Sequence, residues 1–216
     1  IPLPSVLVSP FALSAYEKER HPITEQVSRF AMNHAHAMSK RRKEIPENLE
    51  EQSAEGANAR IAFGQDLYDL NVQQYCCAGL NFGYFYDQSP VMVYDAESAP
   101  DYSMGSFTAS TVPGCRAPHF WLEQDTSLYD ALGAAYTLLC FKPECDAEVS
   151  AFQKAAGEAN MPLKILDVSA YPNRPLEYSH HFVIVRADAH TVWRGDRVTA
   201  ENAKQIVAKL CGYSQA

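Results

Sequence analysis

Apolar residues recur at helical spacing through the first part of the chain. Between Ile23 and Met38 they fall on one side of a helix, and this apolar stripe continues to about Lys43. Residues 10–20 show the pattern of a shorter helix. Proline disfavours helical geometry at the residue before it and suits a first helical turn, so Pro22 is expected to separate the two helices.

A second long helix is predicted to begin just after Ser53. Its apolar side is formed by Ala57, Ile61, Leu67 and Leu70. The connection from the preceding helix is short, so the two long helices are expected to pair in antiparallel fashion. Farther along, apolar and aromatic residues alternate over 80–86, which predicts a strand.

The C-terminal half shows short apolar runs and amphipathic helices instead. The elements expected in chain order are a strand at 136–141, a helix at 146–159, a strand at 163–168, an irregular stretch at 170–178, strands at 181–186 and 191–194, and a helix at 199–211. This βαβ and then ββα order is that of a thioredoxin-like domain, although no Cys-x-x-Cys dithiol is present. We therefore predict an α+β protein, in which a helical hairpin and a strand precede a thioredoxin-like α/β domain lacking CxxC.

A change of composition marks the expected domain boundary. Residues 95–111 are rich in Ser, Ala, Pro, Gly and Asp and contain few large apolar side chains, as is typical of a linker. The sequence therefore predicts a mostly helical region at 1–95, a linker at 96–112 and a C-terminal domain at 113–216.

Charge and hydropathy exclude several classes of partner. The formal net charge of −8 argues against nucleic-acid binding, which needs a basic surface to neutralise phosphates. The basic run at 40–43 is better explained as a helix C-terminus, where cations complement the helix dipole. The longest apolar run, at 131–141, is far shorter than the roughly 20 residues of a membrane-spanning helix, so no membrane partner is expected.

The six cysteines are irregularly spaced. Their pattern is neither the disulfide framework of a secreted protein nor a set of zinc ligands. The chain does not open with a basic segment followed by an apolar stretch, as a signal peptide would. We therefore expect a cytoplasmic protein without a metal site.

Short segments along the chain resemble one enzyme family. Pro-Gly-Cys-Arg-Ala-Pro-His at 113–119, Ser-Leu-Tyr-Asp at 127–130 and the segment 190–196 look like the C-terminal domain of the FAD-dependent aromatic hydroxylases, the single-component flavoprotein monooxygenases. Upstream, Tyr-Glu-Lys-Glu-Arg-His-Pro within 14–23 is similar to the segment that follows the flavin domain in that family. Residues 81–91 look like its Leu-Gly-Tyr-x-Tyr strand. The resemblance is greatest to the hydroxylases of small phenols and 3-hydroxyphenylpropionate-type acids.

The resemblance implies a role in ring hydroxylation with FAD and NAD(P)H. Residues 1–95 would be the helical tail of the flavin- and substrate-domain body. An N-terminal FAD-binding portion, on the same or a separate chain, would be the partner. This chain would brace the substrate domain and assist oligomerisation, with a homodimer expected.

The FAD fingerprint of such enzymes is absent from this chain. Pyrophosphate binding needs a Gly-x-Gly-x-x-Gly turn at a helix N-terminus, and none occurs here. The Gly-Asp segment expected for the flavin ribityl chain is also missing, since the one Gly-Asp pair lies at 195–196. No cofactor is therefore expected on this chain alone.

Aromatic residues near the predicted strand are the candidates for substrate contact. Tyr84 and Tyr86 carry hydroxyls that can hold a phenolate or carboxylate, and Phe82 is their apolar neighbour. Packing in a strand core or an interface explains the same residues. Structural or interface roles are expected for Phe82, Arg116, His119, Trp121 and Trp193, and both tryptophans are expected to bury much of their area.

Two other functions compete with this interpretation. One is a cofactor-free binding or assembly protein derived from a hydroxylase tail. The other is a thiol peroxidase using Cys145, which lies at the start of a predicted helix, where the dipole favours a thiolate. Lys142 stands where a peroxidase of this kind has an assisting Thr. Cys140 is expected in the core, and four residues separate it from Cys145, so no redox motif is predicted.

Overall fold

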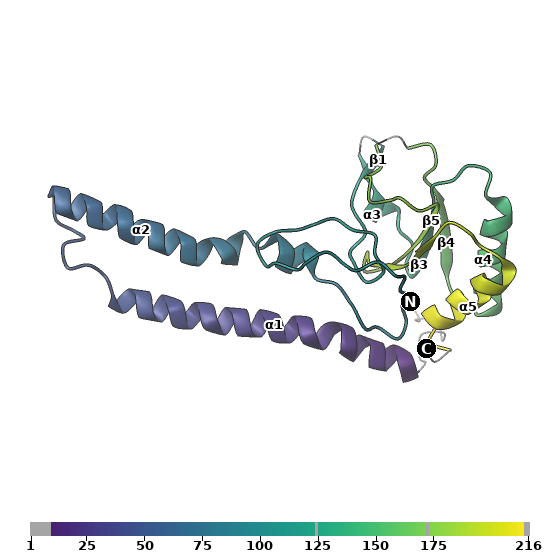
Figure 1. Ribbon diagram of the computed structural model, residues 1–216, viewed down its shortest axis with the longest axis horizontal. Coiled ribbons are helices and arrows are strands. Elements are labelled where there is room, and N and C mark those ends of the chain that lie inside the picture. Colours follow the sequence, from purple (N-terminus) through teal and green to yellow (C-terminus); the bar gives the residue numbers. More distant parts are fainter. Residues whose placement is uncertain (1–9, 124, 172, 214–216) are drawn as a thin grey trace. The chain divides into compact units, whose positions relative to one another are not determined.

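Two units make up the structure, a computed structural model that describes residues 10–123, 125–171 and 173–213 (Figure 1). The larger unit consists of Ile1–Arg20, Tyr84–Asp101 and Thr108–Ala216, and the smaller consists of His21–Gly83 and Tyr102–Phe107. The described residues form five α-helices and two small sheets, so the predicted α+β class is confirmed. The predicted division of the chain into a helical region at 1–95, a linker at 96–112 and a C-terminal domain at 113–216 stays a prediction.

The first helix, α1, runs without interruption over Pro10–Lys43. The predicted break at Pro22 is wrong, because Pro22 lies inside this helix. Proline removes a single backbone donor, and the Glu, Lys, Arg and Ala residues on both sides are good helix formers that favour continuation. Lys40, Arg41, Arg42 and Lys43 occupy the last turn, as expected for a helix C-terminus.

In the smaller unit the second helix, α2, spans Ala54–Tyr75. An ion pair of 3.0 Å joins Arg41 Nη2 to Asp66 Oδ2, and the Asn71 amide donates to the sulfur of Met38 at 3.6 Å. The α1 residue that comes first, Met38, thus contacts the α2 residue that comes last, Asn71. This order confirms that the two helices are antiparallel (Figure 1).

Helix α2 begins just after Ser53, as predicted, and Ser53 is its N-cap. The Ser53 hydroxyl accepts a hydrogen bond of 3.0 Å from the Gly56 amide. Removing that acceptor leaves a helix-terminal N–H without its partner, so Ser53→Ala should cost about 1 kcal/mol of helix stability. Thermal unfolding followed by far-ultraviolet circular dichroism measures the effect. Ser39→Ala, at an exposed position near the C-terminal end of α1, is the control and should not lower stability.

The strand predicted at 80–86 is wrong. Gly79–Gly83 forms a five-residue π-helical turn instead, and residues 84–86 belong to no helix or strand. The Leu80 amide donates to the Met104 carbonyl at 3.2 Å, and a Cβ on Gly79 would lie 1.6 Å from the Ser103 carbonyl oxygen. This close approach of two backbone segments sets the local conformation. The alternation of apolar and aromatic residues over 80–86 contains no information about it.

The sheet of the larger unit has the strand order β4-β3-β5-β6. Its strands are β3 (Tyr136–Cys140), β4 (Leu163–Asp167), β5 (Phe182–Arg186) and β6 (Thr191–Gly195), accompanied by helices α4 (Asp146–Glu158) and α5 (Ala200–Leu210). Strands β3 and β4 pair in parallel, whereas β5 is antiparallel to both β3 and β6. All six elements were predicted, with bounds that differ by at most two residues.

Both faces of this sheet are covered. Leu139, Val183 and Val185 pack into one core cluster with residues from 117–128 and with Tyr178. On the other face, Leu138, Ile184 and Trp193 share one register position, and the Trp193 ring lies 5.2 Å from that of Phe152 in α4. The short elements β1 (Trp121–Glu123), β2 (Thr126–Ser127) and α3 (Leu128–Ala131) were not predicted, since two to four residues show no period.

Candidate functional site

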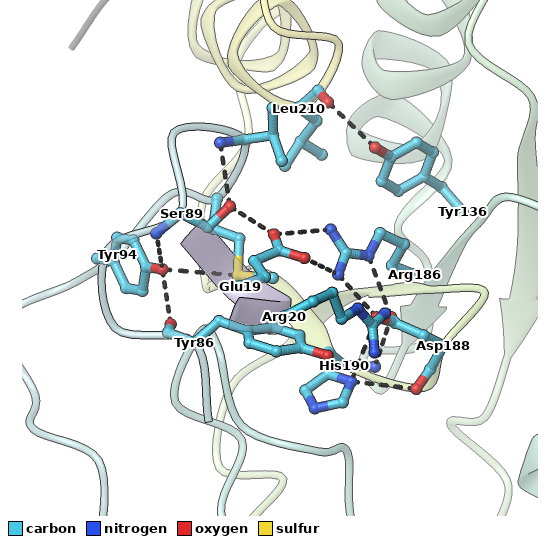
Figure 2. Close-up of polar contacts among 12 residues, drawn as sticks. Glu19, Arg20, Tyr86, Ser89, Tyr94, Tyr136, Arg186, Asp188, His190 and Leu210 are labelled. Carbon is cyan, nitrogen blue, oxygen red and sulfur yellow. Dashed lines mark hydrogen bonds and ion pairs between the residues drawn. The ribbon is translucent and has the colours of Figure 1, made fainter. Parts of the chain in front are cut away.

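Four charged side chains interlock in the larger unit. We call Glu19, Arg20, Arg186 and Asp188 the Glu19 clamp (Figure 2). The Arg186 guanidinium donates to both carboxylate oxygens of Glu19, at 3.0 and 2.7 Å, and to both of Asp188, at 3.1 and 2.7 Å. Arg20 donates to Asp188 at 2.9 Å, and the Ser89 hydroxyl donates to Glu19 at 2.6 Å. The clamp thus joins α1 to the end of β5 and the turn after it.

The charges of the clamp balance, and burial strengthens their pairing. Only 4% of the Glu19 side chain and 17% of the Arg186 side chain are exposed. Burial opposes ionisation of Asp188, but hydrogen bonds from His190 and Arg186 and the nearby positive charge hold the pKa of its carboxyl well below its usual range. Burial likewise opposes the charge on Arg186, yet its two carboxylate partners raise its pKa. Asp188 and Arg186 therefore remain charged at neutral pH.

An aromatic layer lies against the clamp. The His190 ring is 4.4 Å from the Tyr86 ring and 5.4 Å from the Tyr84 ring, and its Nδ1 is 3.1 Å from the Asp188 carbonyl oxygen. The guanidinium of Arg20 lies 5.3 Å from the centre of the Tyr86 ring (Figure 2). Within the described part of the chain, His190 Nε2 and the Tyr86 hydroxyl are buried without hydrogen-bond partners. Burial raises the pKa of Tyr86, which therefore stays a phenol.

Four of the five segments that carry the family resemblance meet at this point. Segment 14–23 supplies Glu19 and Arg20, segment 81–91 supplies both tyrosines and Ser89, and segment 190–196 supplies His190. Segment 113–119 joins them through its backbone, since Gly114 accepts from the Tyr86 amide at 3.0 Å and donates to the Thr191 carbonyl at 2.7 Å. Arg186 and Asp188 were missed because they lie outside these segments, and a charged residue at a strand end resembles any solvated position.

Arg116, His119 and Trp121 gather in a second cluster around Tyr129. The His119 Nε2 atom lies 2.9 Å from the Ser127 hydroxyl, and its ring is 5.0 Å from that of Trp121 and 5.3 Å from that of Tyr129. The Arg116 guanidinium stacks 5.0 Å from the centre of the Tyr129 ring. Arg116 and His119, chosen separately from the sequence, thus contact the same aromatic residue.

The two tryptophans differ in burial. Trp193 is buried, as expected. The expected burial of Trp121 is wrong for this chain, because 58% of its surface is exposed. Trp121 begins the short strand β1, where alternate side chains point outward.

The remaining candidates lie elsewhere. Phe82 is in the smaller unit, 48% exposed, with its ring 6.3 Å from that of Phe107. Cys145 is the N-cap residue of α4, is partly buried and caps no backbone amide. Cys140 is buried in β3, as predicted.

The cleft that described residues form beside the clamp is small. The cleft beside it has a volume of about 180 Å³, which is small against the roughly 300–1,000 Å³ of typical ligand sites. Among the described residues, no three His, Cys, Asp or Glu side chains are grouped to bind a metal ion. No described helix is long and apolar enough to cross a membrane. The clamp is therefore suited to hold segments together, because every charge in it is already neutralised.

The βαβ unit does not fit FAD. A dinucleotide would need a glycine-rich turn between its first strand and its helix. Here the turn from β3 to α4 is Phe-Lys-Pro-Glu-Cys over 141–145, which contains no glycine. The first turn of α4 also carries Asp146 and Glu148, which repel a pyrophosphate.

The clamp makes stability depend on pH. Asp188 has a lowered pKa in the folded protein, so its contribution is complete above the unfolded-state pKa of about 3.9 and is lost as pH falls below it. Wild-type stability should therefore fall as the pH drops from about 4 to 2. Asp188→Asn should be less stable at pH 7 and should show a shallower fall in that interval. Urea unfolding at a series of pH values measures this, with the exposed Asp101→Asn as the control for loss of one negative charge.

Comparisons with known proteins identify relatives of one chemical type. No protein-family model matches the chain. The FAD-dependent monooxygenase apdD of Emericella nidulans is 29% identical over 216 aligned positions, covering 94% of this chain and 34% of that protein. Phenol 2-monooxygenase of a Pseudomonas species is 27% identical, covering 94% of this chain and 38% of that protein.

Solved structures agree with these relatives. The rebeccamycin biosynthetic enzyme RebC, determined with reduced flavin, superimposes with a TM-score of 0.80 at 29% identity, over 95% of this chain and 37% of RebC. The sequence resemblance to FAD-dependent aromatic hydroxylases is confirmed, since the relatives are FAD-dependent monooxygenases and include a phenol hydroxylase. The chain spans between about a third and two fifths of the length of the curated relatives it matches.

Proposed function

We propose that this chain is the C-terminal part of a flavin-dependent aromatic ring monooxygenase. FAD and NAD(P)H would be bound by an N-terminal portion, and this part would brace the substrate domain and assist formation of a homodimer. The relatives are FAD-dependent monooxygenases of which the chain matches between about a third and two fifths. The β3–α4 turn does not suit a dinucleotide, which favours placing the cofactor on other polypeptide.

The observation that carries the bracing role is the Glu19 clamp. Four segments that resemble the hydroxylases, far apart in sequence, are joined by it or by the Gly114 backbone. Buried charges that are fully paired contribute little catalytic chemistry, but they specify one arrangement of the segments they join. We infer that the clamp fixes the first part of α1 on the C-terminal sheet. The polypeptide joined to α1 would thereby keep a fixed position relative to that sheet.

The C-terminal domain of this proposal is thioredoxin-like. The β4-β3-β5-β6 strand order, with one parallel and two antiparallel pairings, supports that assignment. Because no Cys-x-x-Cys is present, a scaffolding role is favoured over dithiol exchange of the usual kind.

Exposed apolar side chains support a covering partner. Ile61, Tyr68 and Tyr75 recur every seven residues along α2 and expose 72%, 63% and 77% of their surfaces. Such spacing places them on one helix face, and a row of this kind favours contact with another polypeptide. We assign the N-terminal FAD-binding portion as that partner, because the relatives are between two and a half and three times as long as the region matched. Trp121 would be covered in the same way.

The substrate role predicted for Tyr84 and Tyr86 remains a proposal. Tyr86 is buried against His190, with 2% of its surface exposed. Tyr84 is partly exposed and is the better placed of the two to reach a substrate. Its hydroxyl would hold a phenolate or carboxylate of the substrate.

Titration of FAD against the purified 216-residue chain tests the placement of the cofactor. The proposal predicts no saturable quenching of flavin fluorescence, since the chain lacks a dinucleotide cradle. Sedimentation of the same sample shows whether the chain forms a dimer by itself. Stoichiometric FAD binding by this chain would overturn the proposal. A stable colourless dimer whose native form never joins a flavin-bearing polypeptide would favour the assembly protein instead.

A further inference from the structure

The larger unit has another cleft, formed by residues of 85–99 and 112–113. Its volume is about 340 Å³, within the roughly 300–1,000 Å³ that is typical of ligand sites. We call it the Tyr94 cleft, and its lining consists of Phe85, Asp87, Tyr94, Glu97, Ser98, Ala99, Val112 and Pro113. None of these side chains belongs to the Glu19 clamp, and the proposed function uses none of them.

Most of the lining of the Tyr94 cleft is apolar or aromatic. Val112 and Pro113 are buried, Phe85 is partly buried, and 37% of the Tyr94 surface is exposed. Ligand pockets of this size are mostly apolar, with a few polar groups that fix the orientation of the ligand. The lining therefore suits a ligand with an aromatic ring.

Hydrogen bonds hold the walls of the cleft in place. The Tyr94 hydroxyl accepts from the Ser89 amide at 2.9 Å and donates to the Tyr86 carbonyl at 2.6 Å (Figure 2). The Glu97 amide donates to the Asp95 carboxylate at 2.9 Å. Because these walls are fixed before a ligand arrives, binding requires little ordering of the protein.

The charges at the Tyr94 cleft select the sign of its ligand. Asp87 and Glu97 bring carboxylates to it, and none of the described lining residues is Lys, Arg or His. The Arg194 guanidinium pairs with Asp95 and Glu97, at 2.6 Å each, and 3% of its side chain is exposed. Two carboxylates thus share one positive charge, and Asp87 adds another negative charge. The cleft therefore attracts a cation and repels an anion.

We propose that the Tyr94 cleft binds a small organic cation, namely a protonated amine joined to an aromatic ring by a short alkyl chain. The ring contacts the apolar lining, and the ammonium group pairs with the Asp87 carboxylate. The 3-hydroxyphenylpropionate-type acids that the sequence resemblance implies as substrates are anions, so the cleft does not suit them. This site does not depend on the proposed function.

Two probes of the same shape and opposite charge test the proposal. 2-Phenylethylamine and 3-phenylpropionate share a ring and a two-carbon chain, and at about pH 7 the first is a cation and the second an anion. Each is titrated into the ¹⁵N-labelled full chain, and the amide resonances of Glu97, Ser98 and Ala99 are followed by NMR. The amine should shift them saturably, with a Kd on the order of 1 mM for so small a ligand. The acid should bind at least about tenfold more weakly.

Variants assign the contacts within the cleft. Asp87→Asn should weaken binding of 2-phenylethylamine about two- to fivefold, as expected for the loss of one partly exposed ion pair. Asp101→Asn is the matched control, because Asp101 is exposed and does not line the cleft, and it should leave the Kd unchanged. Ala99→Trp should fill the cleft and abolish the saturable shifts.

Three results would overturn the proposal. The first is no saturable shift at an amine concentration about ten times the expected Kd. The second is equal affinity for 2-phenylethylamine and 3-phenylpropionate. The third is a saturable shift confined to amides outside the Tyr94 cleft. Each is read from the wild-type chain, so a variant that fails to fold does not weaken the test.

Discussion

Arg186→Met should destabilise the larger unit by about 3–5 kcal/mol, a large part of the roughly 5–15 kcal/mol that stabilises a typical domain. Arg186 donates to both oxygens of two carboxylates, Glu19 and Asp188. Methionine has a similar length but no charge, so the Glu19 carboxylate would remain 4% exposed with Ser89 as its remaining donor among the described contacts. Urea unfolding of the full chain measures the change in the free energy of unfolding.

A second variant distinguishes the lost charge from lost packing. In Arg186→Met combined with Glu19→Gln, the stranded carboxylate is neutral, so part of the lost stability should return. Arg197→Met is the matched control, because Arg197 is exposed, and it should change stability by less than about 0.5 kcal/mol. Wild-type stability in Arg186→Met would show that the clamp does not hold the unit together.

Gly114→Ala should destabilise the same unit by at least about 1–3 kcal/mol through backbone strain alone. Gly114 has φ of +99°, a conformation that residues with a side chain rarely adopt. A Cβ there would also lie 2.1 Å from the Tyr86 carbonyl oxygen. Since Gly114 bonds to both Tyr86 and Thr191, any shift that relieves the clash loosens two segments at once.

Gly157→Ala is the opposite case and serves as the control. Gly157 lies inside α4, and a Cβ at that position would meet nothing within 4 Å. Alanine loses less backbone entropy than glycine in a helix, so this variant should gain about 0.5–1 kcal/mol. If Gly114→Ala and Gly157→Ala had the same effect, the strain assigned to Gly114 would be absent.

The elements with a clear period could be predicted from the sequence. The strands and helices after residue 135 were found within two residues, because buried strands and amphipathic helices carry long apolar patterns. The π-helical turn at 79–83 was not, since it depends on a backbone contact with Ser103 that no local pattern encodes. The break expected at Pro22 failed because neighbouring helix formers outweigh one missing donor.

The candidate site was only partly predictable. The segments that resemble the hydroxylases led to the prediction of Tyr84, Tyr86, Arg116 and His119. The same segments also contain Glu19 and Arg20, which were not singled out. The residues that complete the clamp, Arg186 and Asp188, are charged groups near a strand end, and sequence alone cannot tell a paired buried charge from a solvated one.

The flavin content of the native protein decides whether this chain is part of an FAD-dependent enzyme. An antibody raised against the 216-residue chain would isolate that protein from its source under gentle conditions, and flavin absorbance would be measured against polypeptide content. We expect stoichiometric FAD, carried either on a longer polypeptide that includes this sequence or on a tightly bound partner. A colourless 216-residue polypeptide with no flavin-bearing partner would contradict it.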